Sequence, residues 1–80
     1  MRFRMYERVR IRKLIRADAD YNDWIINKRA PQVGDIGCLI DVLHAPSLPD
    51  MYVVEYSDSN TGETTWLADF YEDELEPMGQ

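Results

Sequence analysis

Short stretches of alternating apolar and polar residues recur along the chain, and this pattern is typical of β-strands with one buried face. The alternation is found over residues 6–15, 36–43, 51–56 and 64–70. In the first stretch Val9 and Ile11 alternate with arginines, and in the fourth Trp66 shares a face with Phe70. Leu75 anchors one more short strand near the end of the chain. The pattern therefore predicts five short strands.

The first connection is long and has a different pattern. Residues 18–29 lose the alternation and place Tyr21 and Trp24 three positions apart, as on a helix. We expect a long first loop with a short helix near residues 18–26. Because Trp66 alternates within a strand and Trp24 does not, Trp66 is expected to be buried and Trp24 at least partly exposed.

Glycines mark two of the turns. Between Pro31 and Gly37 the chain carries Gly34 and Gly37, and at least one of them is expected to need a positive φ or a close backbone approach. Residues 58–63 predict a hairpin loop with Gly62 in the left-handed conformation. This stretch begins like a calcium-binding loop, but residues 66–68 occupy positions that must be strand, so the hairpin is the favoured interpretation.

These elements predict a mostly β fold: a five-stranded antiparallel barrel that is partly open, with a short 3-10 turn near residues 71–74. The first and last strands commonly neighbour each other in such barrels, so residues near the two ends are expected to lie together. Eighty residues fit one domain, which we expect over residues 1–80 with its core at about 6–77.

Four segments of the sequence carry a resemblance to a known group. They are Pro31-Gln-Val-Gly-Asp-Ile-Gly, Tyr52-Val-Val-Glu-Tyr, Trp66-Leu-Ala-Asp-Phe and Glu74-Leu-Glu-Pro. Together they resemble small bacterial proteins of unassigned function with SH3-like barrels, and their pattern is similar to that of KOW-type and nitrile hydratase β-subunit-like barrels. The likeness covers about residues 6–77. It implies an SH3-like fold and brings no functional residue with it.

Charge divides the chain into two unequal parts. Residues 1–30 hold all nine basic residues and four acidic ones, a net charge of +5, whereas residues 31–80 hold eleven acidic residues and no basic one, a net charge of −11. The pI of about 4.5 opposes binding to phosphates, although four arginines between Arg8 and Arg16 could form a basic stripe. A nucleic acid partner is therefore the weakest of the alternatives, and a partner with a basic surface is favoured.

Residues for catalysis or metal binding are scarce. His44 is the one histidine and lies just before Ala45-Pro46 in a connection, without a second histidine or a nucleophile at a recognisable spacing. Cys38 lies within an apolar strand, where a thiol is usually inert. Zinc needs about four nitrogen or sulfur ligands. We expect no enzyme activity, no cofactor and no metal.

The compartment is inferred from what the sequence lacks. A single cysteine cannot form an intrachain disulfide, and no apolar run approaches the roughly 18 to 20 residues that cross a bilayer. The first residues carry charge but no apolar stretch of the kind that a secretion signal has. We expect a cytoplasmic protein without a membrane partner.

Aromatic and acidic side chains supply the candidate binding site. Tyr21 and Trp24 on the long loop and Tyr71 on the late turn are expected to flank one another as apolar anchors, although Trp24 could instead cap the open end of the barrel. The acidic residues beside them are Asp69, Glu72, Asp73 and Glu74.

This surface predicts a non-catalytic protein-binding module for a basic partner. Such a module suits an immunity or antitoxin-like inhibitor or an accessory subunit. The alternative is a structural homo-oligomer, in which the basic N-terminal edge of one chain meets the acidic face of another as a weak dimer.

Overall fold

The computed structural model describes residues 3–21 and 27–78. In chain order its elements are β1 (Arg8–Ile11), the 3-10 helix η1 (Asp18–Tyr21), β2 (Ile36–Leu43), β3 (Met51–Ser57), β4 (Thr64–Phe70), the 3-10 helix η2 (Glu72–Glu74) and β5 (Leu75–Pro77). All five strands, the short helix of the first loop and the late 3-10 turn are thus confirmed. Trp24, expected to be partly exposed, lies outside the described residues. Within the described residues, no helix has the length and apolar character needed to span a membrane.

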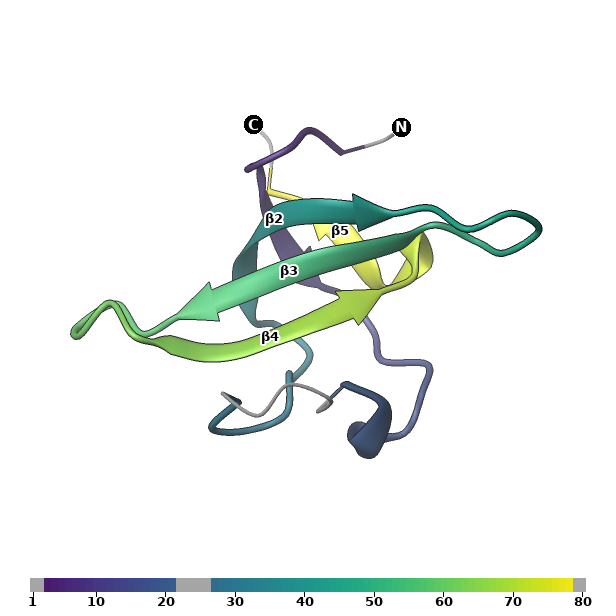
Figure 1. Ribbon diagram of the computed structural model, residues 1–80. Helices are drawn as coiled ribbons and strands as arrows, with labels where there is room; N and C mark the ends of the chain where they lie inside the picture. The colour runs from purple at the N-terminus through teal and green to yellow at the C-terminus, as the bar shows by residue number, and fades with distance from the viewer. Residues whose placement is uncertain (1–2, 22–26, 79–80) are drawn as a thin grey trace.

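The strands form one antiparallel sheet in the order β4-β3-β2-β1-β5 (Figure 1). β2, β3 and β4 make the layer nearer the viewer, and β1 and β5 cross behind it. β2 joins the two layers, because its first half pairs with β1 and the rest pairs with β3. A register shift between Leu39 and Asp41 is a bulge of the kind that bends a strand. Among the described residues β4 and β5 do not pair, so the sheet is five-stranded and antiparallel but not closed into a barrel.

β1 is much shorter than its predicted stretch of residues 6–15. It ends at Ile11 because the following backbone N–H groups turn towards Glu74. Arg12 N donates to the Glu74 carbonyl oxygen at 2.8 Å, and Ile15 N donates to the Glu74 carboxylate at 3.2 Å. The chain after β1 therefore wraps around one buried side chain instead of continuing the ladder.

The two glycines of the turn before β2 serve different purposes. Gly34 has a φ of 96°, which confirms that a left-handed residue is needed there. Gly37 is buried in β2, where an added Cβ would lie 2.6 Å from the carbonyl oxygen of Glu55 and 2.7 Å from Cγ1 of Val54. The bend of β2 thus requires a residue without a side chain at Gly37. The predicted hairpin loop is also confirmed, with Gly62 at a φ of 77°.

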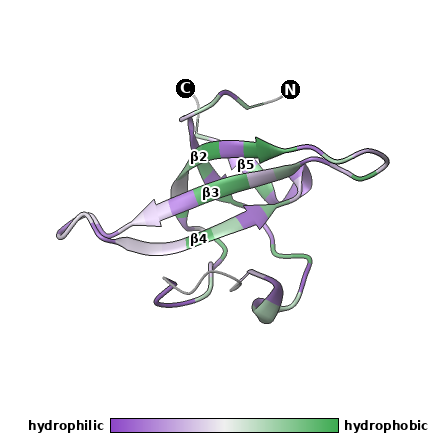
Figure 2. Cartoon of the chain, viewed as in Figure 1, coloured by the Kyte–Doolittle hydropathy of each residue, from purple (hydrophilic) through white to green (hydrophobic). Residues whose placement is uncertain are grey.

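Inward-facing residues of every strand meet in one core. Its members, all at most 3% exposed, are Phe3, Val9, Ile11, Tyr21, Leu39, Tyr52, Val54, Trp66, Ala68, Phe70 and Leu75. Trp66 lies at the centre of this core with no exposed surface, as predicted, and its ring meets that of Phe70 edge to face at 5.6 Å. In Figure 2 hydrophobic colour covers much of β2 and the middle of β3, β2 carries a hydrophilic band, and much of β4 is pale.

The outer edge of β4 is covered by the chain itself. Lys28 N donates to the carbonyl oxygen of Thr65 at 2.8 Å. The side chain of Asn27 accepts a hydrogen bond from Leu67 N at 2.7 Å and donates one to Leu67 O at 3.1 Å. Its amide group therefore makes the two hydrogen bonds that a residue of a neighbouring strand would make. Further along, Arg16 Nη2 donates to the carbonyl oxygen of Asp69. These contacts occupy backbone groups that another strand would otherwise pair with.

Candidate functional site

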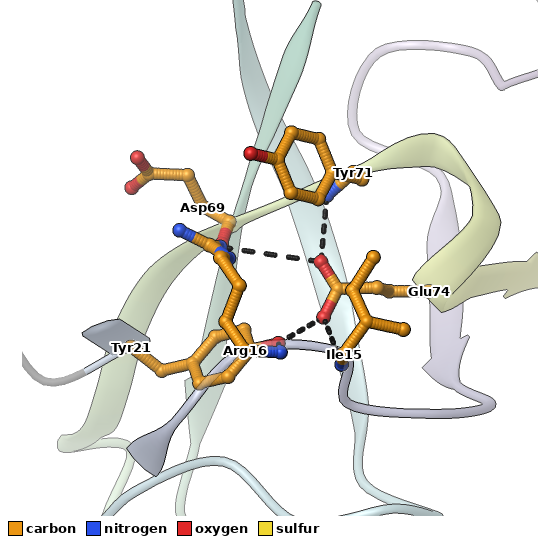
Figure 3. A network of polar contacts seen from close by, with 6 residues as sticks. All are labelled: Ile15, Arg16, Tyr21, Asp69, Tyr71 and Glu74. Atoms are coloured by element: carbon orange, nitrogen blue, oxygen red, sulfur yellow. Dashed lines mark hydrogen bonds and ion pairs between the residues drawn. The ribbon is translucent and has the colours of Figure 1, made fainter. Parts of the chain in front are cut away.

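One carboxylate of the late acidic run is completely buried. Glu74, the last residue of η2, has no exposed surface. Its carboxylate accepts hydrogen bonds from Tyr71 N at 2.8 Å, from Ile15 N at 3.2 Å and from the hydroxyl of Tyr21 (Figure 3). A buried charge is costly unless it is paired and hydrogen-bonded, and these donors meet that need. Glu74 therefore ties η2 to η1 and to the segment after β1.

Arg16 provides the positive charge beside Glu74. Its Nη2 atom lies 4.0 Å from Oε1 of Glu74. Its guanidinium carbon lies 4.6 Å from the centre of the Tyr21 ring and 5.1 Å from the centre of the Tyr71 ring. Arg16 Nε is buried without a hydrogen-bond partner among the described residues, a cost that the ring contacts and the ion pair offset. The guanidinium thereby holds the Tyr71 ring in place.

Tyr21 keeps its proton inside this cluster. Burial raises the pKa of its hydroxyl, and the hydrogen bond to the Glu74 carboxylate raises that pKa further, against the opposing effect of the hydrogen bond donated by Arg16 N. The ring stacks on Phe70 with centres 5.4 Å apart. The neutral hydroxyl thus remains a donor to Glu74 at physiological pH.

Two predicted site residues prove to be structural. Tyr21 was expected on a loop surface but is 1% exposed, because its ring fills the core and its hydroxyl is held by Glu74. Glu74 was expected on a solvated acidic face, but the turn of η2 directs it inward. Both predicted positions are therefore wrong. Trp24, the third proposed anchor, lies outside the described residues.

The other four predicted residues lie around two adjoining hollows on the surface. The first, which we call the Ile15 hollow, has a volume of about 420 Å³ and is lined by Ile15, Pro49, Asp50, Tyr52, Tyr71, Glu72 and Asp73. The second, the Leu48 hollow, has a volume of about 330 Å³ and is lined by Arg16, Leu43, His44, Ala45, Leu48, Pro49, Met51, Asp69 and Tyr71. Pro49 and Tyr71 line both hollows, so Tyr71 stands between them. Together they form the Tyr71 groove.

Charge is distributed unevenly along the groove. Among the described residues that line it, the Ile15 hollow has three carboxylates and no lysine or arginine. The Leu48 hollow has one carboxylate, Asp69, and one arginine, Arg16. His44 Nδ1 lies 2.8 Å from Oδ1 of Asp50, which links the two ends of the loop between β2 and β3 that walls both hollows.

A second, partly buried ion pair lies away from the groove. Arg29 Nη1 is 2.8 Å from Oδ2 of Asp35, and the same oxygen accepts from Trp66 Nε1 at 2.9 Å and from Gln32 N at 3.0 Å. Burial alone would raise the pKa of Asp35, but these hydrogen bonds and the Arg29 charge outweigh burial and lower it. The pair anchors the central tryptophan to the loop before β2, which is a structural role.

Two kinds of reactive group can be assessed among the described residues, a metal-binding cluster and a cysteine thiol. No three His, Cys, Asp or Glu side chains within residues 3–21 and 27–78 are arranged to hold a metal ion. Burial, with a smaller effect of the Glu55 charge, raises the pKa of the Cys38 thiol, the opposite of what an activated nucleophile needs. The groove itself presents apolar side chains, several carboxylates and the guanidinium of Arg16.

Two residues of the groove that were not among the predicted site residues come from a proline-rich connection and from the end of the predicted first strand. Leu48 lies in a loop between two prolines yet is 66% exposed, and Ile15 is 53% exposed. An apolar side chain in a proline-rich turn is a signal that could have been used, because such a loop has little core to join. Arg16 was considered only as part of a basic stripe.

Comparisons of the chain with protein-family models, with curated proteins and with solved structures found no match.

Proposed function

We propose that the protein is a non-catalytic binding module that holds a segment of another protein in the Tyr71 groove. The observation that carries this proposal is the pair of adjoining hollows with apolar walls and a carboxylate rim. Apolar side chains exposed beside like charges favour a partner that is apolar at its contact and basic around it. An immunity or antitoxin-like inhibitor of a basic protein, or an accessory subunit, would use such a surface.

The fold supports this proposal as a scaffold. We take the open sheet to be an SH3-like barrel, because its last strand pairs with its first and a 3-10 turn precedes that last strand. Both hollows lie between the loop after β2 and the segment after β1, beside Tyr71, and the Ile15 hollow also includes residues of η2. Binding residues carried on loops above a rigid sheet are a common arrangement in small domains.

A random peptide library displayed on phage tests the proposal. Wild-type protein is the bait, and two variants are run beside it. Leu48→Gln changes an apolar residue of the groove that is 66% exposed, and Val33→Gln changes one outside the groove lining that is 61% exposed. Because both side chains are exposed, neither variant should alter the thermal unfolding midpoint appreciably.

We expect the wild type and Val33→Gln to retain the same peptides, and Leu48→Gln to lose them. Equal retention by the two variants, or no enrichment by the wild type over a bare support, would refute the proposal.

A further inference from the structure

We infer that the two hollows are separate subsites, the Ile15 hollow for a lysine or arginine side chain of the partner and the Leu48 hollow for an aliphatic or aromatic one. This inference rests on the proposed function and adds the chemistry that each part of the Tyr71 groove recognises.

The Ile15 hollow matches the two parts of a long basic side chain. Lysine and arginine have an apolar stem and a charged head. Ile15, Pro49 and the ring of Tyr71 supply apolar surface for a stem. Asp50, Glu72 and Asp73 place carboxylates around the same hollow. A cation can also lie over the face of a tyrosine ring, which adds to the attraction.

The Leu48 hollow has a less acidic lining. Five of its nine lining residues are aliphatic or sulfur-containing: Leu43, Ala45, Leu48, Pro49 and Met51. The charge of Arg16 in its lining is balanced by the carboxylate of Asp69, so this hollow attracts a cation less than the three carboxylates of the Ile15 hollow do. Met51 adds a flexible side chain that can adapt to apolar groups of different shapes. An apolar side chain of the partner is therefore favoured here over a basic one.

The covered edge of β4 determines how a partner can bind. Asn27, Lys28 and Arg16 occupy backbone groups of that edge, so addition of a strand there would have to displace them. Side chains must then provide the contacts. In an extended segment, residues i and i+2 point to the same side about 7 Å apart, which suits two hollows that share a wall. The expected pattern in the partner is a basic residue and an apolar residue separated by one position.

A double-mutant design tests the assignment with defined peptides. The probes are the acetylated, amidated pentapeptide Gly-Lys-Gly-Leu-Gly and its two single changes, lysine to glutamine and leucine to alanine. Binding to isotope-labelled protein is followed by NMR titration. The protein variants are Asp73→Asn in the Ile15 hollow and Leu48→Gln in the Leu48 hollow. Asp41→Asn, an exposed site outside the groove lining, removes the same charge and controls for the change in net charge.

We expect the wild type to prefer the lysine peptide over its glutamine form by about two- to fivefold, the range of an exposed ion pair. Asp73→Asn should lose that preference and keep the one for leucine, whereas Leu48→Gln should do the reverse. Asp41→Asn should retain both preferences.

Three results would overturn the assignment. The first is that Asp73→Asn and Leu48→Gln weaken the preference for lysine and the preference for leucine equally. The second is that the parent peptide causes no NMR chemical-shift changes at residues of the groove. The third is concentration-dependent shifts without peptide, which would mean that a second copy of the chain fills the groove. Failure of this test with continued enrichment from the phage library would refute the two subsites alone, whereas failure of the library itself would refute the binding function.

Discussion

Glu74 shows how a single side chain can organise the structure around a proposed binding groove. Its carboxylate connects η2 to the segment after β1, and the neighbouring guanidinium of Arg16 lies against the Tyr71 ring that separates the two hollows. A displacement of this carboxylate would therefore alter the shape of the groove. The residue is structural, yet the shape of the proposed site depends on it.

Replacing Glu74 with glutamine should destabilise the protein by about 2 to 4 kcal/mol, because buried donors lose an acceptor and Arg16 loses its partner charge. Asp73→Asn, on the same short helix but exposed, is the matched control and should stay within about 0.5 kcal/mol of the wild type. Urea denaturation of the three proteins measures the difference. Equal midpoints for Glu74→Gln and Asp73→Asn would show that the buried carboxylate does not hold this end of the fold together.

Asp35 should make the stability sensitive to acid. Its folded-state pKa is lowered below the ordinary value of 3.8, so its contribution is present above that value and is lost as pH falls through the folded-state pKa. The difference in free energy of unfolding between the wild type and Asp35→Asn should therefore be largest at neutral pH. This difference should become smaller below about pH 4. A gap that stays constant with pH would contradict the ion pair with Arg29.

The sequence allowed some of these residues to be placed and not others. The burial of Trp66 follows from alternation within a strand, which is a local pattern. The inward turn of Glu74 does not, because its donors come from Ile15 and Tyr21, more than fifty positions away. An acidic run looks the same in sequence whether all of its members are solvated or one of them is buried. Only the three-dimensional arrangement of donors distinguishes the two cases.

Among the elements, β2 carries the bend that gives the sheet its two layers. Its strand character could be predicted from the alternation of apolar and polar residues. The need for glycine at Gly34, just before the strand, and at Gly37, within it, could be predicted too. The group that covers the outer edge of β4 could not be predicted from the sequence, because it is an asparagine side chain in an irregular segment. Nothing in the local pattern around Asn27 indicates that it pairs with Leu67, forty positions later.

Substitution of Gly34 and of Gly37 by alanine and by asparagine should separate the cost of a strained backbone from the cost of steric crowding. Gly34 has a positive φ but open space around it, so alanine should cost about 1 kcal/mol and asparagine less, since asparagine tolerates this conformation. Gly37 has no room for a Cβ, so both substitutions should cost about 1 to 3 kcal/mol or more. Chemical denaturation of the four variants gives the comparison. If asparagine were tolerated equally well at both glycines, β2 would not need the close approach described above.

Asn27→Ala should expose the edge of β4. We expect a loss of about 1 kcal/mol for the hydrogen bonds to Leu67 and a greater tendency to associate at high concentration, since unpaired edges recruit other strands. Lys28→Ala is the matched control, because the edge contact of Lys28 uses its backbone N and survives removal of the side chain. Urea denaturation and static light scattering measure the two effects. If Asn27→Ala scattered no more than Lys28→Ala, the asparagine would not protect the edge.

At the scale of the whole molecule, the charge division along the sequence is partly offset within the fold. Among the described residues, four ion pairs join a basic residue of the first thirty positions to an acidic residue of the remaining fifty: Arg10 with Glu76, Arg16 with Glu74, Lys28 with Glu63 and Arg29 with Asp35. The weak dimer named above as the alternative would be favoured by open sheet edges and by an unneutralised acidic half. The contacts along the outer edge of β4 and the four ion pairs satisfy part of each need within one chain.

We therefore expect the wild type to sediment as a monomer at both low and high salt, since its net charge of −6 also repels other copies. Reversing Arg10 and Arg12 to glutamate should leave a monomer that is destabilised by about 1 kcal/mol or less per exposed pair, with an effect that shrinks once salt brings the Debye length to about 8 Å. Adding Glu76→Arg to the double reversal restores opposite charges at the pair with Arg10 and should recover part of the loss. A wild-type dimer that dissociates with salt and is split by the double reversal would instead show that the basic edge of one chain meets the acidic face of another. In that case the acidic face would be occupied by the protein itself rather than by a foreign basic partner.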